Sequence, residues 1–275
     1  MNIKTFFPAV IASVFLLINA STGYAASITK TLCNPADSDN GYGAGTFNGK
    51  FYSWFELSQE DITDCDTKIG FYNETNRHFR VEWNVAQSWG EDAIGGMGWS
   101  SGSRDRKIGY NVGQLTTNSS IQKALVAMYG WSCSTSGGNQ ISQEYYVVDT
   151  WDGGKFVPWD ENANNGNGAP AQSVGTVSAN GATYDVYKVR RYGAQYCFNG
   201  SSRSFDQFWS VRRTPRAING NRNMDFRPHA NRWDNSDLGF KVDGLSSGYQ
   251  ILAVEIFGDA NLRHKGAADI TLWPR

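Results

Sequence analysis

The 275-residue sequence is short of charge, of histidine and of long apolar segments, and each shortage excludes a class of protein. Only 19% of the residues are charged and the net charge is -1, which gives neither a basic field for nucleic acid nor an acidic tail. The three histidines and four cysteines do not have the spacing of a zinc site. We therefore expect no metal, no cofactor and no nucleic-acid partner, and surface or core roles for His78, His229 and His264.

The longest apolar segment, Phe6–Ile18, is too short to span a bilayer and lies at the N-terminus. Lys4 precedes it, and Gly23-Tyr24-Ala25 follows with small residues at the spacing of a cleavage site. We expect residues 1–25 to be a cleaved signal peptide and residues 26–275 to form one secreted, monomeric domain without a membrane partner. An uncleaved anchor or a lipoprotein is the alternative, although no cysteine closely follows the apolar segment.

Glycine and aromatic residues are plentiful, with 30 glycines, 10 tryptophans and 14% aromatics, as is typical of a β-sandwich with stacking surfaces. Short alternating segments recur, Asn180-Gly181 is a hairpin signal, and Asp152–Gln172 has the composition of a long surface loop. Only Phe226–Trp233 has a helical period. The expected strands are Phe51–Leu57, Lys68–Tyr72, Phe79–Val85, Gly95–Trp99, Lys107–Val112, Ala124–Trp131, Gln143–Thr150, Ser173–Ser178, Thr183–Arg191, Gln207–Arg213, Tyr249–Phe257 and Ala268–Trp273.

Two of these strands carry a glutamate in line with an aromatic residue. In Gln143–Asp149, alternation places Glu144 and Tyr146 on one face and Asp149 on the other. In Tyr249–Phe257, Glu255 shares a face with Tyr249. Two carboxyl groups facing each other across a cleft could cleave a glycosidic bond, one ionised and the other protonated. The alternative is that both glutamates point into solvent.

An even number of cysteines in an exported chain suggests two disulfides, with three possible pairings. We favour Cys33–Cys65, which joins the two early cysteines, and Cys133–Cys197, which would tie two loops near the proposed cleft.

Six segments in register resemble family 11 glycoside hydrolases, the endo-1,4-β-xylanases, and the resemblance runs from about residue 41 to residue 273. The helical stretch with His229, Asn231 and Trp233 is also similar to a family motif. Each motif alone is weakly specific, but their order is that of the family. The six segments are Gly95–Trp99, Tyr129-Gly130-Trp131, Glu144–Val148, Thr183–Tyr187, Gln207–Arg212 and Ala253-Val254-Glu255.

The resemblance implies an all-β jelly roll of two twisted antiparallel sheets with one packed α-helix, and a retaining mechanism. Glu144 matches the nucleophile of the family and Glu255 its acid/base. The segment Tyr192–Asp206, hereafter the thumb, corresponds to a hairpin that closes over the xylan chain. The other matched positions, which hydrogen-bond, charge or stack near the nucleophile and the bound sugar, are Tyr129, Tyr146, Arg191, Gln207 and Tyr249.

Three positions bear on how this chain differs from others of the family. Asp92 aligns with a residue beside the acid/base that is Asp in acid-active members, which implies an acidic optimum; an outward-facing turn residue is the alternative. Phe55 stands where a tryptophan usually stacks on a distal xylose. Gln195 stands where the tip of the thumb usually has proline, which leaves sugar affinity and thumb behaviour open.

Two other functions fit parts of the sequence. A β-1,4-glucanase of the sister family would share the jelly roll, and a non-catalytic xylan-binding protein would explain the aromatic residues. The second alternative does not require two glutamates among apolar strand residues, so xylan hydrolysis is the favoured interpretation.

Overall fold

The computed structural model describes residues 31–32, 41–57, 67–73, 76–85, 92–118, 124–152, 155–160, 169–193, 196–198, 203–258 and 263–275. The expected signal peptide, the expected Cys33–Cys65 disulfide and Gln195 lie outside these ranges, so those expectations stay predictions. No helix in the described ranges is both long enough and apolar enough to cross a membrane.

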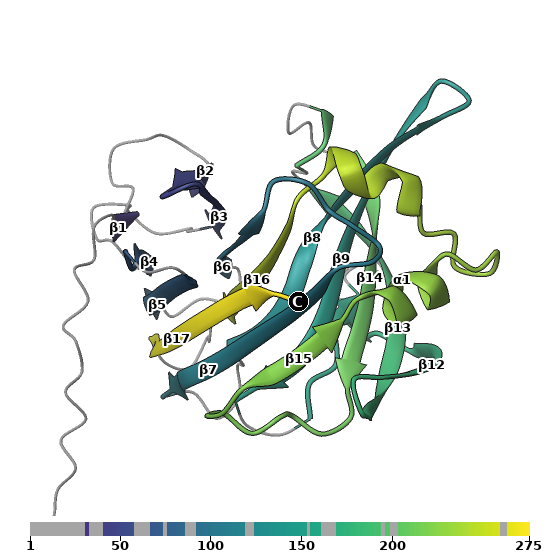
Figure 1. The fold of residues 1–275 in the computed structure, drawn as a ribbon. Helices are drawn as coiled ribbons and strands as arrows, with labels where there is room; N and C mark the ends of the chain where they lie inside the picture. The colour runs from purple at the N-terminus through teal and green to yellow at the C-terminus, as the bar shows by residue number, and fades with distance from the viewer. Residues whose placement is uncertain are drawn as a thin grey trace, which may run out of the picture.

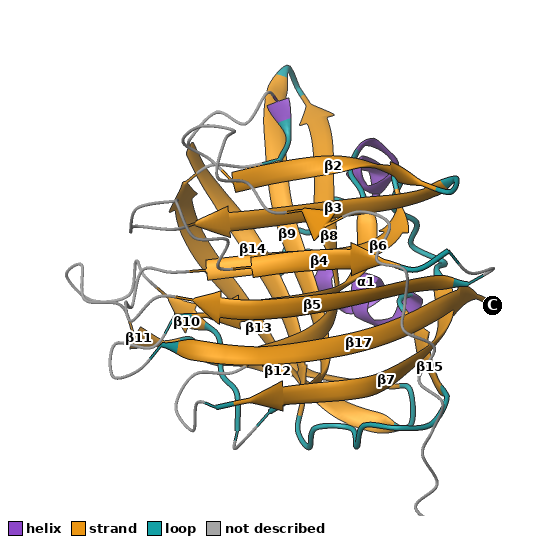
Figure 2. Ribbon diagram, turned by 90° about the vertical axis from the view of Figure 1, so that its left-hand side faces the viewer, coloured by secondary structure: helices purple, strands orange, loops and turns teal. Residues whose placement is uncertain are grey.

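Two β-sheets pack face to face, and in Figure 2 the smaller one lies in front of the middle strands of the larger one. The smaller sheet has the order β1 (Thr31–Leu32), β4 (Thr67–Phe71), β5 (Arg77–Val85), β17 (His264–Pro274), β7 (Lys107–Thr117) and β15 (Arg222–Asp225). The larger sheet has the order β12 (Ser173–Ala179), β13 (Ala182–Gly193), β14 (Arg203–Arg212), β9 (Asn139–Trp151), β8 (Ala124–Ser136), β16 (Gln250–Phe257), β6 (Asp92–Trp99), β3 (Lys50–Leu57) and β2 (Gly41–Phe47). All the strands that the sequence predicts are present.

Strand β9 occupies the middle of the larger sheet, between β8 and β14 (Figure 1). It pairs antiparallel with β8 but parallel with β14, which the expectation of purely antiparallel sheets did not include. The parallel pair arises because β12, β13 and β14 alternate in direction, so that β12 and β14 both run in the direction of β9. The segment between β9 and β12, hereafter the returning segment, therefore begins and ends at opposite ends of the sheet. This returning segment also contains two short paired strands, β10 (Trp159–Asp160) and β11 (Ala169–Pro170). The prediction of a loop throughout Asp152–Gln172 was therefore wrong in part.

The larger sheet is apolar on both faces, which explains the almost continuous burial of β16. Leu252 and Val254 belong to the core between the sheets, together with Tyr145 and Val147 of β9. The alternate residues face a second apolar cluster on the outer face of this sheet, and they include Tyr146, Val148, Ile251 and Ala253. The outer face, hereafter the cleft face, is the one that carries Glu144 and Glu255 by the same alternation.

Glycines in β6 allow β16 to approach closely. A Cβ atom at Gly96 would lie 2.1 Å from the carbonyl oxygen of Leu252, and one at Gly98 would lie 2.3 Å from that of Gln250. Such distances are far inside van der Waals contact, so neither position accepts a side chain without displacing β16. The Gly-rich segment of the sequence thus fixes the strand that carries Glu255.

The helix α1 (Arg227–Trp233) forms where the sequence predicts it, with a proline in the first turn. It buries His229, Ala230 and Trp233, and the Trp233 ring packs against Tyr145 of β9 at a centroid distance of 6.2 Å. The predicted hairpin at Asn180-Gly181 is also present, with positive φ angles of 53° and 70° at its two turn residues. A 3-10 helix, η2 (Val242–Ser247), precedes β16.

Candidate active site

Glu144 lies on the cleft face of β9 with only 6% of its surface exposed and three neutral hydrogen-bond donors around it. The Tyr129 hydroxyl donates to Oε1 at 2.6 Å, and the Tyr146 hydroxyl is 3.1 Å from the same oxygen. The Gln207 amide donates through Nε2 to Oε2 at 2.5 Å. Donors of this kind stabilise a carboxylate without neutralising its charge.

Further donors hold these partners in place. The Oε1 atom of Gln207 accepts hydrogen bonds from Arg191 Nε at 3.0 Å and Trp209 Nε1 at 3.2 Å. Because both nitrogens can only donate here, the oxygen of the Gln207 amide must face them and its NH₂ must face Glu144. The Tyr129 hydroxyl likewise accepts from Trp131 Nε1 at 3.0 Å, which leaves its own hydrogen for Glu144. The sequence thus supplies a preorganised anion site.

Glu255 lies on the cleft face of β16 and is 4% exposed. The Tyr146 hydroxyl is 3.1 Å from its Oε1 atom, so one phenol bridges the two glutamates. The Oε2 atom of Glu255 is buried and has no hydrogen-bond partner within the described part of the chain. Burial without a partner is costly for an ionised carboxylate oxygen and therefore favours the protonated form of this group.

The Tyr146 hydroxyl has a single hydrogen for its two contacts with Glu144 and Glu255. It can serve only one acceptor, so if it donates to Glu144, the contact with Glu255 needs a proton on Glu255. Burial raises the pKa of Glu255 well above its usual range, and the negative charges of Asp92 and Glu144 raise it further. Burial also raises the pKa of Glu144, but its hydrogen bonds and the charge of Arg191 oppose that shift. Of the two carboxyl groups, the surroundings of Glu255 favour the protonated form more strongly than those of Glu144.

Asp92, Phe55 and Tyr249 lie near this pair in the larger sheet. Asp92 of β6 faces Phe257 in the register of β16, two residues from Glu255 on the same face. Phe55 of β3 is opposite Ile94, which is itself opposite Glu255. The buried Tyr249 ring packs edge-on against Tyr129 at 5.9 Å. The structure thus brings together all the described residues that the sequence singled out for chemistry and sugar binding.

The supporting roles of two tryptophans were not predicted from the sequence. Trp209 stacks on Tyr146 with 3.6 Å between ring centroids and 1° between planes. Trp131 orients Tyr129, as described above. Both lie in segments that resemble the family, and alternation from Gln207 and Tyr129 would have placed them on the cleft face. Their hydrogen-bond partners depend on side-chain geometry that alternation does not give.

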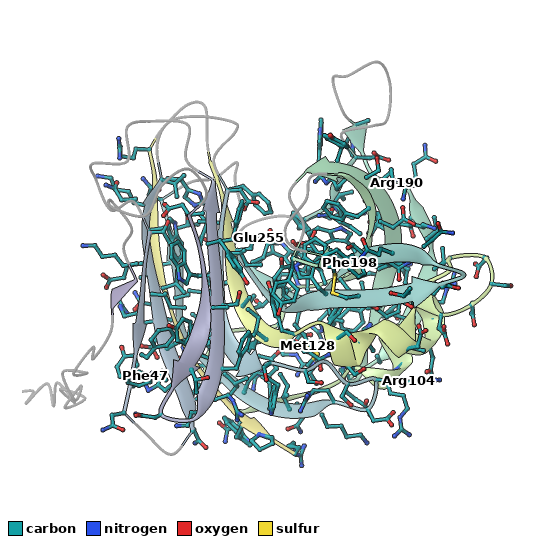
Figure 3. All side chains as sticks on the ribbon, turned by 90° about the horizontal axis from the view of Figure 1, so that it is seen from above. Phe47, Arg104, Met128, Arg190, Phe198 and Glu255 are labelled. Atoms are coloured by element: carbon teal, nitrogen blue, oxygen red, sulfur yellow. A yellow bond between two sulfur atoms is a disulfide. The ribbon has the colours of Figure 1, made fainter. Side chains whose placement is uncertain are left out.

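The expected disulfide between Cys133 and Cys197 is present, with 5.5 Å between the two Cα atoms. Cys133 belongs to β8 and Cys197 to the thumb, so the bridge ties the thumb to the sheet. Figure 3 shows it as a yellow bond beside Phe198, close to Glu255 in that view.

A cavity of about 740 Å³ lies apart from the glutamate pair, where β12 and β13 meet the segment around Val157 and Ala171. We place the chemistry at the glutamate pair because the cavity has no hydrogen-bonded pair of carboxyl groups. Its lining residues are Lys155, Val157, Pro170, Ala171, Ser173, Thr176, Asp185, Tyr187 and Arg213. Among the described residues, no cluster of three or more histidine, cysteine, aspartate or glutamate side chains could hold a metal ion.

Two buried carboxyl groups bridged by one hydroxyl, on rigid strands of a β-sandwich, are the arrangement that a glycoside hydrolase needs. Comparison with known families gives the same class. The sequence profile of glycosyl hydrolases family 11 matches residues 48–270, and the chain belongs to this family.

Curated relatives are similar over most of the chain. An endo-1,4-β-xylanase A of Schizophyllum commune is 29% identical over 230 residues, which are 83% of this chain and 96% of the relative. An endo-1,4-β-xylanase 3 of Pyricularia oryzae is 32% identical over 212 residues, covering 77% of this chain and 73% of the relative. A solved structure from a comparison of two major endo-1,4-β-xylanases of Trichoderma reesei superposes with a TM-score of 0.52 at 25% identity, covering 74% and 92% of the two chains. This match confirms the expected jelly roll.

Proposed function

We propose that the protein is a secreted endo-1,4-β-xylanase that hydrolyses internal bonds of xylan with retention of configuration. The observation that carries this proposal is the hydroxyl of Tyr146, which bridges the two buried glutamates. In the proposed mechanism Glu144 is ionised and Glu255 is protonated. The names of the relatives supply the substrate, because each is an endo-1,4-β-xylanase similar over most of this chain.

In the first step, the Glu144 carboxylate attacks the anomeric carbon and the bond to the glycosidic oxygen breaks. Glu255 gives its proton to that oxygen, which leaves as a free hydroxyl group. In the second step, Glu255 takes a proton from water, the water oxygen bonds to the anomeric carbon, and the bond to Glu144 breaks. Two inversions at one carbon restore the original configuration.

The geometry of the bridge favours retention over inversion. Because each glutamate oxygen is 3.1 Å from the same hydroxyl, the two oxygens can be separated by no more than twice that distance. This limit lies below the separation of about 6.5 Å or more that inverting enzymes need for an intervening water. It accommodates the roughly 5–5.5 Å of retaining enzymes.

An acidic pH optimum is part of the proposal, and it depends on how Asp92 and Glu255 share the catalytic proton. The negative charge of Asp92 raises the pKa of Glu255, which by itself would keep Glu255 protonated to higher pH. The optimum becomes acidic if Asp92 and Glu255 share a proton that the active form needs, because activity then falls as Asp92 ionises.

Hydrolysis of xylan and of soluble cellulose by the wild-type protein tests the substrate. We expect reducing sugars from xylan and little or none from cellulose. A preference for cellulose would favour the β-1,4-glucanase, and binding of xylan without any release of sugar would favour a non-catalytic protein. NMR of the first-formed anomer tests retention separately, since an initial α-anomer would refute the double displacement.

A further inference from the structure

Another cavity, of about 440 Å³, is lined by two arginines and, among the described residues, by no carboxylate. Its walls come from both sheets, since Arg77 begins β5 of the smaller sheet and Trp99 ends β6 of the larger one. The connection from β6 to β7 completes the wall and contributes Arg106. The remaining lining residues are glycines, serines and Phe51. The cavity thus combines positive charge with hydroxyl groups.

The ring of Trp99 holds the two arginines close to each other. The guanidinium carbon of Arg77 lies 4.4 Å from the centre of this ring, and that of Arg106 lies 4.1 Å from it. Each contact is favourable separately, but together they place two positive charges beside one side chain. Burial lowers the pKa of both guanidinium groups, and the charge of Arg77 adds to the shift at Arg106. Both groups stay charged at neutral pH, because arginine is a very weak acid.

The protein uses only part of the donors of each guanidinium group. Arg77 donates through Nε to the carbonyl oxygen of Gly98 at 3.0 Å. Arg106 donates through Nε to Oε1 of Gln250 at 3.0 Å and through Nη2 to the carbonyl oxygen of Ser101 at 2.9 Å. All three acceptors are neutral. Since a guanidinium group has five N–H donors, both arginines keep donors for another partner.

No acidic side chain of the described part of the chain forms an ion pair with either arginine. Asp105, the residue before Arg106, pairs instead with Arg227 at 2.6 Å. Two partly buried positive charges without a counter-charge repel each other, and a bound anion would relieve that repulsion.

The cavity adjoins the cleft face through Phe51. This residue lies opposite Gly98 in the pairing of β3 with β6, and it packs on the apolar cluster of the cleft face. Its ring is 5.6 Å from that of Tyr249, which packs in turn against Tyr129. Neither Glu144 nor Glu255 lines the cavity, so the cavity is separate from the catalytic pair.

We propose that Arg77 and Arg106 form a binding site for an oxyanion such as a carboxylate. The planar fork of a guanidinium group matches two oxygens of an oxyanion, and its charge strengthens both hydrogen bonds. The hydroxyl groups of Ser100 and Ser103 line the same cavity and supply neutral donors. The oxyanion has two sources, a free acid in solution or a uronic-acid branch of a xylan chain in the cleft. The second source rests on the function proposed above.

Calorimetric titration with sodium glucuronate at constant ionic strength tests the site, and glucose is the neutral comparison. Glucuronate should bind to wild type and glucose should not. Arg77→Gln should raise the dissociation constant for glucuronate about tenfold or more, because charge-assisted hydrogen bonds are lost. Arg77→Lys keeps the charge without the fork and should cause a smaller increase.

Arg104→Gln is the matched control for the loss of one positive charge. Arg104 lies in the same connection as Arg106, but it is exposed, hydrogen-bonds Asn231 and does not line the cavity. Its loss should leave the affinity for glucuronate unchanged. An absence of glucuronate binding to wild type, or an equal loss in Arg77→Gln and Arg104→Gln, would overturn the site. Thermal unfolding of each variant identifies any that are not folded.

The source of the oxyanion is decided in a Glu144→Gln background, which stops turnover during the titration. A xylo-oligosaccharide with one glucuronic-acid branch is compared with an unbranched one of the same length. If the branch supplies the oxyanion, the branched ligand should bind about tenfold more tightly, and Arg77→Gln should remove the difference. Equal affinities, with binding of free glucuronate that still depends on Arg77, would assign the site to a free acid. Hydrolysis of unbranched xylan by wild type tests the proposed function without involving this site.

Discussion

Strand β9 carries two buried carboxyl groups five residues apart, on opposite faces of one sheet. Glu144 faces the cleft and has only neutral donors, two phenols and an amide, in direct contact. Asp149 faces the core, is completely buried, and accepts hydrogen bonds from Tyr110 and Tyr184. It also has ion-pair partners, Arg216 at 2.9 Å and Arg212 at 3.6 Å.

The difference between these carboxyl groups lies in what compensates their charge. Two arginines next to Asp149 neutralise it, so this group contributes to the cohesion of the two sheets and has little reactivity. Neutral donors next to Glu144 leave the negative charge available to an electrophilic carbon. Burial is common to both positions and therefore does not identify the reactive one. The two positions differ in whether the partners of the carboxyl group are neutral or positively charged.

The largest effect is expected when the charge of Glu144 is removed. Glu144→Gln keeps the size of the side chain and removes the nucleophile, so kcat on xylan should fall by about 10⁴-fold or more. The unfolding midpoint in urea should stay close to that of wild type. Substantial residual activity would show that Glu144 is not the nucleophile.

The matched change at Asp149, on the core face of β9, should lower stability and leave turnover nearly unchanged. Asp149→Asn leaves two arginines without their carboxylate, so the free energy of unfolding should fall by about 3–5 kcal/mol. The turnover number per folded molecule, measured well below the unfolding temperature, should remain within about threefold of wild type. A large loss of kcat in a folded variant would place Asp149 in the chemistry and break the comparison.

Removal of the Tyr146 hydroxyl, which bridges the two glutamates, should reduce activity by an intermediate amount. Tyr146→Phe removes one hydroxyl that contacts both carboxyl groups, and hydrogen bonds to charged groups contribute about 1.5–3 kcal/mol each. We expect kcat/KM to fall by about 10- to 100-fold, with a change in the separation of the two limbs of the pH profile. Trp209→Phe is a useful companion, because it keeps a ring beside Tyr146 but removes the donor to Gln207. An unaltered pH profile in Tyr146→Phe would show that the bridge does not set the protonation states.

Asp92→Asn should have the smallest effect, a shift of the pH profile toward neutral with little change in the maximal rate. The reason is that the amide cannot ionise, so the shared proton is no longer lost at acidic pH. The direct effect of charge has the other sign, because removing a negative neighbour lowers the pKa of Glu255 and moves the alkaline limb to lower pH. A shift of the alkaline limb to lower pH would therefore refute the acidic optimum.

Alternation and the family motifs predicted the strands, the helix and the juxtaposition of Glu144 with Glu255. They also placed Asp149 on the face opposite to Glu144. They could not show which groups surround Asp149. Its ion-pair partner Arg216 is in a connection after β14, and its hydrogen-bond partner Tyr110 is in the other sheet. Contacts of this kind depend on how the sheets are superposed, and a period of two carries no such information.

The thumb and the returning segment were harder to predict for another reason. The contact of Tyr196 with Tyr249 accompanies the disulfide between the thumb and β8, and local periodicity does not show such a contact. Strands β10 and β11 have only two residues each, too few to show alternation. The parallel pairing of β9 with β14 depends on the end of the sheet at which β12 begins, and local periodicity does not give that end.

The partners of Glu144 also imply an order of assembly. Tyr129 and Tyr146 are 15 and 2 residues away in the chain, whereas Gln207 is 63 residues away, across the parallel pair. The contact that joins Tyr146 to Glu255 spans 109 residues. Local hairpins close faster than contacts between distant segments, since less chain entropy is lost. During refolding, the β8–β9 hairpin should therefore form before the two glutamates meet, and the return of activity would report one of the last steps of folding.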